Sequence, residues 1–347
     1  MHTKARNWKW HRALLAAPLA AGLSGCDMVV MNPSGDVARQ QADLILWSTG
    51  LMLLIVVPVM ILIALFAWRY RASNPDSEYK PDWDHSTGLE LVIWSAPLLI
   101  IIALGALTWL ATHTLDPYRP LDRIAPGQKF HAAERALEVQ VVALDWKWLF
   151  IYPEQGVATV NELVVPVNRQ VRFRLTSAGV MNTFYVPAMA GMVYTMAGME
   201  TKLHAVLNKP GDFAGMSANY SGAGFSGMNF RTHAVDDAAF ARWVAKVKAS
   251  GGTTLDGATY LKLEQPSERA PVTYFASVQR GLFDRAVNLC VKPGTPCMSE
   301  SMHAHPAAVP AEAVVQPQPG AQPAAAPPAN SRQSHQSHGA HAPATGA

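Results

Sequence analysis

The amino-acid sequence predicts a two-helix transmembrane hairpin, then an all-β sandwich, a short helical C-terminal region and a disordered tail. Two stretches, 44–68 and 91–115, contain no Asp, Glu, Lys or Arg and are rich in Leu, Ile and Val. The segment after them carries short β-branched runs separated by Gly and Pro, which is typical of sandwiches and small barrels. From about residue 306 the chain is mostly Ala, Pro, Gln and Ser, a composition with too few apolar side chains to fold.

The composition excludes several classes of protein. Of the 347 residues, 50% are hydrophobic and 15% are charged, whereas average soluble domains carry roughly 25% charged residues. The formal net charge is only +3, which argues against a nucleic-acid-binding protein with a concentrated basic face. The only cysteines are Cys26, Cys290 and Cys297, so the chain is neither a disulfide-dense scaffold nor a zinc ribbon.

The N-terminus has the features of an export signal. A basic start precedes the apolar stretch 13–23, which is shorter than the ~20 residues that a membrane span requires. The stretch ends in Leu23-Ser24-Gly25-Cys26, which resembles a bacterial lipobox. Residues 1–25 are therefore predicted to be a lipoprotein signal peptide, with Cys26 as the lipid-attachment residue. The alternative is an ordinary signal peptide that happens to end near a cysteine.

The two apolar stretches are each long enough to cross the ~30 Å hydrocarbon layer of a bilayer as a helix. We place the first transmembrane helix at 44–68, a cytoplasmic loop at 69–88 and the second transmembrane helix at 89–115. A lipid-modified Cys26 lies on the outer face of the bacterial inner membrane, and the basic residues of the loop fit the positive-inside rule. The N-terminal segment 26–43 and everything from about Asp116 are then periplasmic.

Residues 125–235 are expected to form the sandwich. The stretch 137–152 (LEVQVVALDWKWLFIY) alternates apolar and polar residues before it becomes aromatic, which favours a strand. The further strand candidates are 162–167, 170–175, 203–207 and 228–235.

Residues 236–297 are expected to form a helical extension. An aspartate at 236 or 237 can cap a helix whose apolar residues repeat at i, i+3, i+4 and i+7, namely Phe240, Trp243, Val244 and Val247. The stretch 274–287 predicts a second short helix. Cys290 and Cys297 are close in the chain, so a local disulfide fits an oxidising compartment, and the alternative is two free thiols. The tail, 306–347, is expected to be disordered.

Several motifs within the expected sandwich resemble one known family. The stretch 180–187 (VMNTFYVP), the tripeptide 213–215 (FAG) and the segment up to Met228 are similar to subunit II of haem-copper respiratory oxidases. The resemblance runs from the first span to about residue 290 and implies a cupredoxin-like fold for the sandwich. In cytochrome c oxidases this subunit carries a dinuclear copper centre, held by a His, by the pattern Cys-x3-Cys-x3-His-x2-Met and by a Glu between the cysteines.

This sequence departs from that copper-binding pattern at almost every ligand. The first His corresponds to Asn182, the cysteines to Ser217 and Ser221, the Glu to Asn219 and the second His to Phe225, while only the methionine is kept, as Met228. Bridging and blue-copper sites need thiolates, and no Cys lies between Cys26 and Cys290. The histidines of this region are His131, His204 and His233, and none has a thiolate partner. No metal or cofactor is therefore expected on this chain.

The form of the family that lacks this copper is the ubiquinol oxidase of the cytochrome o (bo) type. The segments that look like this form are 145–148 (DWKW), 152–156 (YPEQG), 197–199 (AGM) and 221–228 (SGAGFSGM). The resemblance implies a non-catalytic subunit of a proton-pumping oxidase that oxidises ubiquinol and reduces oxygen to water. Haems, copper and the quinol site are then expected on subunit I, with the small membrane subunits as further partners. Because no copper centre is expected on this chain, Trp146 and Trp148 are interpreted as packing residues.

One carboxylate invites a functional interpretation. Glu90 stands at the cytoplasmic start of the second span, where a charged side chain is costly. In the oxidase family a Glu at this point lies at the mouth of a proton-uptake route into subunit I, so the resemblance implies proton entry at Glu90. The alternative is an interfacial carboxylate that simply ends the apolar stretch.

Two other functions fit parts of the sequence. A cytochrome c oxidase subunit II is nearly eliminated by the missing cysteines. A membrane-anchored periplasmic lipoprotein copper chaperone would bind Cu(I) through thioethers, although methionine more often fills a core. The methionines concerned are Met181, Met189, Met192, Met196, Met199, Met216 and Met228. The tail histidines His335, His338 and His341 could chelate a metal, but a solvated low-complexity tail is the simpler interpretation.

Overall fold

The computed structural model describes residues 28–75, 77–78, 80–130 and 135–300. The expected lipid-attachment residue Cys26, His131 and the tail 306–347 lie outside the described residues.

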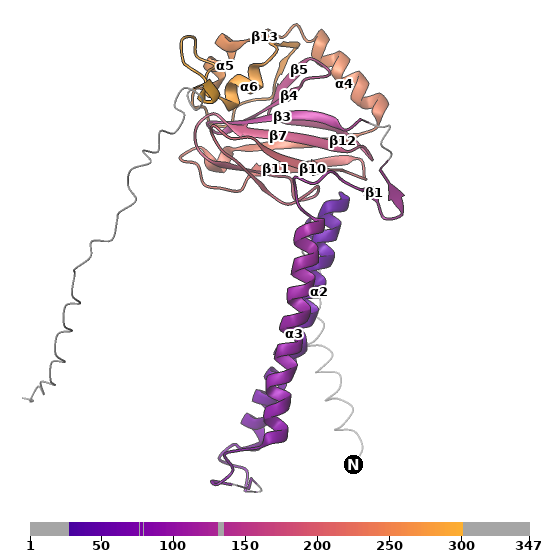
Figure 1. Cartoon of the computed structure of the whole chain (residues 1–347), viewed down its shortest axis with the longest axis vertical. Coiled ribbons are helices and arrows are strands. Elements are labelled where there is room, and N and C mark those ends of the chain that lie inside the picture. Colours follow the sequence, from indigo (N-terminus) through magenta and orange to yellow (C-terminus); the bar gives the residue numbers. More distant parts are fainter. Residues whose placement is uncertain (1–27, 76, 79, 131–134, 301–347) are drawn as a thin grey trace, which may run out of the picture. The chain divides into compact units, whose positions relative to one another are not determined.

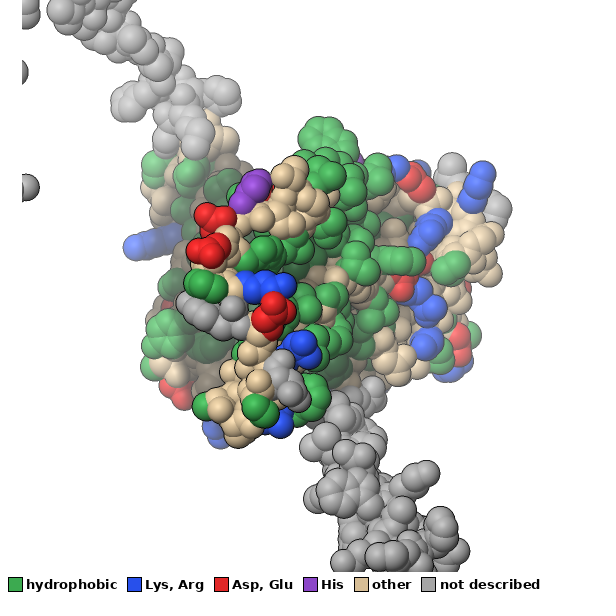
Figure 2. All heavy atoms as spheres, turned by 90° about the horizontal axis from the view of Figure 1, so that it is seen from below, with side chains coloured by type: hydrophobic (Ala, Val, Ile, Leu, Met, Phe, Trp, Pro, Cys, Tyr) green, Lys and Arg blue, Asp and Glu red, His purple; other side chains and the backbone are tan. Residues whose placement is uncertain are grey.

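Two long apolar helices, α2 (Asp36–Arg69) and α3 (Thr87–Thr114), come first and run side by side as a hairpin (Figure 1). Both are long and apolar enough to cross a membrane. Most of their large apolar side chains are exposed, Trp94 to 76%. Figure 2 looks at the molecule from the loop that joins the helices, and apolar side chains cover much of that face. An apolar surface of this extent is suited to lipid rather than to water.

The strands of the sandwich form two sheets. The six-stranded sheet has the order β10 (Thr201–Ala205), β7 (Val171–Ser177), β3 (Leu137–Leu144), β4 (Lys147–Tyr152), β5 (Val157–Val160) and β14 (Thr273–Phe275). The five-stranded sheet has the order β6 (Glu162–Pro166), β12 (Asn229–Val235), β11 (Gly211–Ser217), β8 (Asn182–Tyr185) and β9 (Val193–Thr195). The pairs β3–β7 and β6–β12 are parallel, and the other neighbours are antiparallel. Two short pairs, β1 (Arg123–Ala125) with β2 (Gln128–Lys129) and β13 (Thr254–Leu255) with β15 (Ser277–Val278), lie outside these sheets.

The chain crosses from one sheet to the other at Asn161. This residue lies between β5 and β6 with φ at +57°, a conformation that asparagine tolerates better than most residues. Its amide oxygen accepts a hydrogen bond from the backbone N–H of Trp148 at 2.8 Å, and its amide nitrogen donates to the carbonyl of Ala270 at 2.8 Å. The Asn161 side chain therefore joins the corner to β4 and to the C-terminal region.

Aromatic side chains fill the space between the two sheets. Phe184 lies at their centre, with ring centroids 5.6 Å from Trp148, 5.3 Å from Phe173 and 5.4 Å from Phe230. All four side chains are buried. Because they come from β8, β4, β7 and β12, this cluster holds both sheets together.

A second core lies on the outer face of the six-stranded sheet. The alternate residues Leu149 and Ile151 of β4 point away from the first core and pack against the C-terminal extension, including Tyr260 and Phe283. Strand β4 is therefore buried on both faces, which explains why its sequence from Trp148 to Tyr152 is apolar and aromatic rather than alternating.

The C-terminal extension is only partly helical. Helix α4 (Asp237–Ala249) is confirmed, and its cap is Asp236, which accepts a hydrogen bond from the N–H of Ala239 at 2.6 Å. Helix α5 (Gly257–Glu264) follows. The helix expected over 274–287 is wrong in its first half, because Thr273–Phe275 pairs with β5 as β14 and only α6 (Leu282–Val287) is helical.

The stretch 137–152 also differs from a single strand. It folds back on itself as the hairpin β3–β4, with the turn at Asp145-Trp146 and Trp146 at a φ of +64°. The remaining strand candidates are confirmed as β6, β7, β10 and β12, with ends shifted by one or two residues.

Candidate functional site

The positions predicted from the family resemblance to correspond to copper ligands gather at one end of the five-stranded sheet. Asn182 opens β8, Ser217 closes β11, and Met228 precedes β12. The Ser217 hydroxyl lies 3.2 Å from Asn182 Oδ1 and 3.3 Å from the carbonyl oxygen of Asn219. Asn182, Ser217 and Met228 are buried. The structure thus brings these predicted positions together, as a hydrogen-bonded cluster of neutral groups.

The other two positions lie on a glycine-rich loop that covers Trp146. The indole N–H of Trp146 donates to the carbonyl oxygen of Ser221 at 3.0 Å, and Phe225 packs edge-on against Tyr220 at 5.6 Å. A Cβ added to Gly224 would lie 2.4 Å from the Trp146 ring. This loop therefore needs glycine so that it can close over Trp146, a role that the sequence motif alone did not reveal.

The side chains present do not match the chemistry of a dinuclear copper centre. Such a centre takes thiolate and imidazole ligands, whereas this end of the sheet offers two amides, two hydroxyls, a phenyl ring and one thioether. Within the described residues, no group of three or more His, Cys, Asp or Glu side chains is arranged to hold a metal ion.

The methionines do not form a single site. Met189 and Met228 belong to the core between the sheets, whereas Met192 and Met199 are more than half exposed. The histidines His204 and His233 are also apart, because His204 lies on β10 of the six-stranded sheet and His233 on β12 of the five-stranded sheet. His204 is buried against the side chain of Gln170 at 2.8 Å, and its burial lowers the pKa of the imidazole.

The tetrapeptide 145–148 is structural in this fold. Trp148 lies in the central core, and Lys147 reaches the C-terminal extension. The Lys147 ammonium donates to the carbonyl of Gln265 at 2.8 Å and to the hydroxyl of Ser267 at 2.7 Å. Burial lowers the pKa of this lysine. The packing role expected for Trp146 and Trp148 agrees with these contacts, and Lys147 adds a polar tie between sheet and extension.

Glu90 lies in the first turn of α3, at the loop end of the hairpin. Its carboxylate is 2.6 Å from Nδ1 of His85, and its side chain is 44% exposed. A carboxylate in the first turn also interacts favourably with the helix dipole. The partnership with His85 was missed in the sequence, although the two residues are only five positions apart.

The junction between α2 and the sandwich contains a buried carboxylate that sequence analysis did not single out. Asp36 is 2% exposed, and its Oδ2 accepts a hydrogen bond from Nε of Arg123 at 2.8 Å. The N–H groups of Ser34 and Gly35 donate to the carbonyl of Ala188 at 2.9 and 2.8 Å. The expected helix start at Leu44 therefore falls inside α2, since the first turns of this helix pack against the sandwich. The signal available in the sequence was an acidic residue directly after a glycine, since an acidic side chain is favourable in the first turn of a helix.

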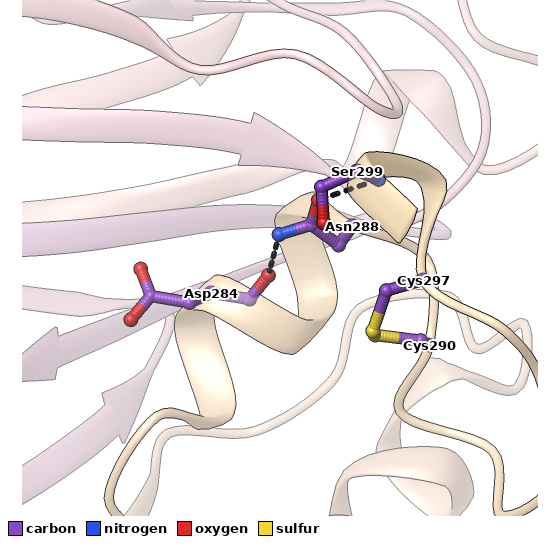
Figure 3. The surroundings of a disulfide bond; sticks show 5 residues. All are labelled: Asp284, Asn288, Cys290, Cys297 and Ser299. Atoms are coloured by element: carbon purple, nitrogen blue, oxygen red, sulfur yellow. Dashed lines mark hydrogen bonds between the residues drawn. A yellow bond between two sulfur atoms is a disulfide. The ribbon is translucent and has the colours of Figure 1, made fainter. Parts of the chain in front are cut away.

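A disulfide closes the end of the extension. Cys290 and Cys297 are joined with their Cα atoms 4.9 Å apart (Figure 3). Beside it, the Asn288 side chain donates to the carbonyl of Asp284 at 2.8 Å and accepts from the N–H of Ser299 at 3.3 Å. The bonds join the segment after the disulfide to α6.

Comparisons with known proteins identify the family. Residues 138–235 match the family described as cytochrome c oxidase subunit II, periplasmic domain, and residues 248–294 match the COX aromatic rich motif. The cytochrome bo(3) ubiquinol oxidase subunit 2 of Pseudomonas putida is 51% identical over 266 residues, which cover 77% of this chain and 82% of that protein. The ubiquinol oxidase subunit 2 of Acetobacter aceti is 50% identical over 265 residues, 76% of this chain and 83% of that protein. This chain belongs to the ubiquinol oxidase subunit 2 family.

The ubiquinol oxidase subunit 2 family membership agrees with the resemblance found in the sequence and leaves the copper chaperone interpretation without support. The aromatic-rich segment corresponds to the extension whose side chains cover the outer face of the six-stranded sheet. Among solved structures, the periplasmic domain of subunit II of the Bradyrhizobium japonicum cytochrome oxidase is 26% identical, with a TM-score of 0.32, and the match covers 33% of this chain and 96% of that one.

Proposed function

We propose that this chain is the non-catalytic subunit II of a proton-pumping oxidase that oxidises ubiquinol and reduces oxygen to water, and that it carries no redox centre itself. The observation that carries the proposal is the cluster around Ser217, where neutral side chains occupy the copper-ligand positions in a chain about half identical to ubiquinol oxidase subunits. Haems, copper and the quinol site then belong to subunit I. Small membrane subunits complete the assembly.

The proposed location is the bacterial inner membrane, with the sandwich in the periplasm and a lipid on Cys26. The apolar helices support membrane insertion. The disulfide fits an oxidising compartment, and the basic residues of the loop 69–88 fit a cytoplasmic loop. The short chain between Cys26 and the first turn of α2 is compatible with a lipid anchor on the same side of the membrane as the sandwich.

Oxygen uptake with different electron donors tests the proposed function directly. We expect the complex purified through a tag on this chain to consume oxygen with ubiquinol and to show no uptake with reduced cytochrome c, because no copper relay joins the periplasmic surface to subunit I. Oxygen electrode measurements with both donors provide the comparison. Uptake with cytochrome c, or the absence of a co-purifying haem subunit, would overturn the proposal.

Glu90 is proposed to be the proton-entry residue. Replacing it by glutamine keeps the shape of the side chain and removes its titratable carboxylate, so we expect Glu90→Gln to slow ubiquinol-driven oxygen uptake severalfold while subunit stoichiometry and haem content stay unchanged. The matched control is Glu78→Gln in the preceding loop, where the carboxylate is 75% exposed and pairs with Lys80 at 3.4 Å. Equal turnover and equal proton release in Glu90→Gln and the wild type would reject this role.

A further inference from the structure

A group of cations lies near the point where α2 meets the sandwich. Lys129 lies on β2, Arg135 precedes β3, Arg169 lies in the turn between β6 and β7, and Lys209 lies between β10 and β11. We call these four residues the basic rim. The side chains of Lys129, Arg135 and Lys209 are exposed, and that of Arg169 is partly exposed. The basic rim is therefore open to an external partner.

Hydrogen bonds bring the four segments of the basic rim together. The Asn208 side chain donates to the carbonyl of Ile124 in β1 at 2.9 Å and to Oδ1 of Asn168 at 3.1 Å. Nε of Arg169 donates to the carbonyl of Arg135 at 3.3 Å. Strand β2 pairs with β1 as a short hairpin. The fold thus gathers cations from distant parts of the sequence into one surface feature.

The described carboxylates beside these segments are already paired with other arginines. The pairs are Asp36 with Arg123, Asp122 with Arg119, Glu138 with Arg172 and Arg174, and Asp212 with Arg231. Within the described residues, the side chains of Lys129, Arg135 and Lys209 have no hydrogen-bond or ion-pair partner. Glu134 lies outside the described residues and offsets at most one of the four positive charges. The basic rim therefore carries surplus positive charge.

The basic rim lies close to the membrane surface. The N–H of Asn208 donates to the carbonyl of Ser34 at 2.8 Å, just before α2 begins. From Asp36 to Leu44, where the uncharged stretch starts, a helix along the bilayer normal rises by about 12 Å. The polar layer outside the hydrocarbon core is about 5–8 Å thick. The start of α2 then lies roughly 4–7 Å beyond that layer, within the Debye length of ~8–10 Å over which charges attract.

The position and charge of the basic rim fit an anionic lipid surface. Figure 2, which looks from the loop end of the hairpin, shows Lys and Arg side chains gathered on one side of the sandwich. Lysine and arginine bind phosphate groups, and each cation close to an anionic membrane strengthens binding about fivefold. An acidic surface of a neighbouring subunit offers the same charge, but only lipid head groups are brought to this level by the membrane helices themselves.

We propose that the basic rim binds the head groups of anionic phospholipids in the leaflet next to the sandwich. The bound phosphates hold the β1–β2 hairpin and the adjoining turns against the membrane, which limits tilting of the sandwich about the start of α2. This inference rests on insertion of the helical hairpin in a membrane. It does not depend on the electron donor of the oxidase or on the role of Glu90.

Photo-crosslinking in lipid nanodiscs tests the proposal. The tagged complex carries p-benzoylphenylalanine in place of Gln128, an exposed residue of the β1–β2 hairpin beside Lys129. The discs contain equal amounts of dioleoyl phosphatidylglycerol and dioleoyl phosphatidylcholine, and the cross-linked products are counted by mass spectrometry. At about 0.1 M NaCl we expect at least fivefold more cross-links to phosphatidylglycerol. The preference should vanish in 1 M NaCl, where the Debye length falls to about 3 Å.

Removing the charge of the basic rim should abolish the preference for phosphatidylglycerol. The variant combines Lys129→Gln, Arg135→Gln and Lys209→Gln. Because these side chains are exposed and have no partner within the described residues, we expect the complex to assemble normally and the ratio of the two lipids to fall to about one. The matched control combines Arg242→Gln, Lys248→Gln and Lys262→Gln, three exposed cations of α4 and α5, and should keep the wild-type ratio.

Three results with the wild-type charges would overturn the proposal. Equal cross-linking to both lipids at low salt would show that the rim does not select anionic head groups. Cross-links to another protein would show that the rim docks on a neighbouring subunit, and the absence of any cross-link would show that water surrounds it. A charge-removal variant with the wild-type ratio of lipids would likewise exclude the basic rim as the binding surface.

Discussion

Replacing Gly35 by alanine is expected to detach the start of α2 from the sandwich and to destabilise the folded chain by about 3 kcal/mol or more, the upper range for overpacking. The added Cβ would lie 2.5 Å from the carbonyl oxygens of both Met189 and Val206. These are backbone atoms, which cannot rotate away as a side chain can. The same residue donates its N–H to Ala188 at 2.8 Å, so relief of the clash would also break that hydrogen bond.

Thermal unfolding of the detergent-solubilised chain measures this effect, with limited proteolysis near the start of α2 as a local readout. The matched control is Gly50→Ala, within the same helix, where a Cβ would meet no atom within 4 Å. Because alanine has the higher helix propensity, the control is expected to be neutral or slightly stabilising. An unfolding temperature of Gly35→Ala equal to that of Gly50→Ala would contradict the packing argument.

Phe184→Ala is expected to destabilise the sandwich by about 3–5 kcal/mol, as is typical when a buried phenylalanine is truncated. Its ring contacts Trp148, Phe173 and Phe230, which belong to both sheets, and its side chain is 0% exposed. Removing it opens a cavity in the centre of the core that strands held by backbone ladders cannot close.

The chain itself offers a control for this change. Tyr194 lies on β9 of the same sheet but is 49% exposed, so Tyr194→Ala should shift stability only slightly. Chemical denaturation followed by tryptophan fluorescence compares the two variants, since Trp148 reports directly on the core. A loss of stability in Phe184→Ala no larger than that in Tyr194→Ala would show that the aromatic cluster does not hold the sheets together.

The helical hairpin could be predicted because its signal is local. Uncharged apolar stretches of this length have few alternatives to a membrane helix, and the structure places α2 and α3 over both. Helix α4 could be predicted equally well, since its cap and its apolar stripe lie within one short segment. The start of α2 at Asp36 could not be predicted from the sequence. Its first turns are stabilised by contacts with residues far away in the chain, such as Arg123 and Ala188.

The extension shows the same limit. Thr273, Tyr274 and Phe275 favour a strand by residue type, but three residues are too few to predict one. The segment becomes a strand because it pairs with the edge of β5. The second core on the outer face of β4 could not be predicted either. The apolar run from Trp148 to Tyr152 indicates burial on both faces, but it does not indicate which part of the protein covers the second face.

The sequence by itself determined the residue chemistry of this protein: two uncharged spans, and amides, hydroxyls and a phenyl ring at the positions that the family resemblance predicts to correspond to copper ligands. Those facts depend only on which side chains are present. Only the tertiary structure decided which of these side chains are buried and what they hydrogen-bond to, because both depend on residues distant in the chain. In the tertiary structure a glycine-rich loop lies over Trp146, and Asp36 is buried at the junction of α2 with the sandwich, where Arg123 donates a hydrogen bond to it.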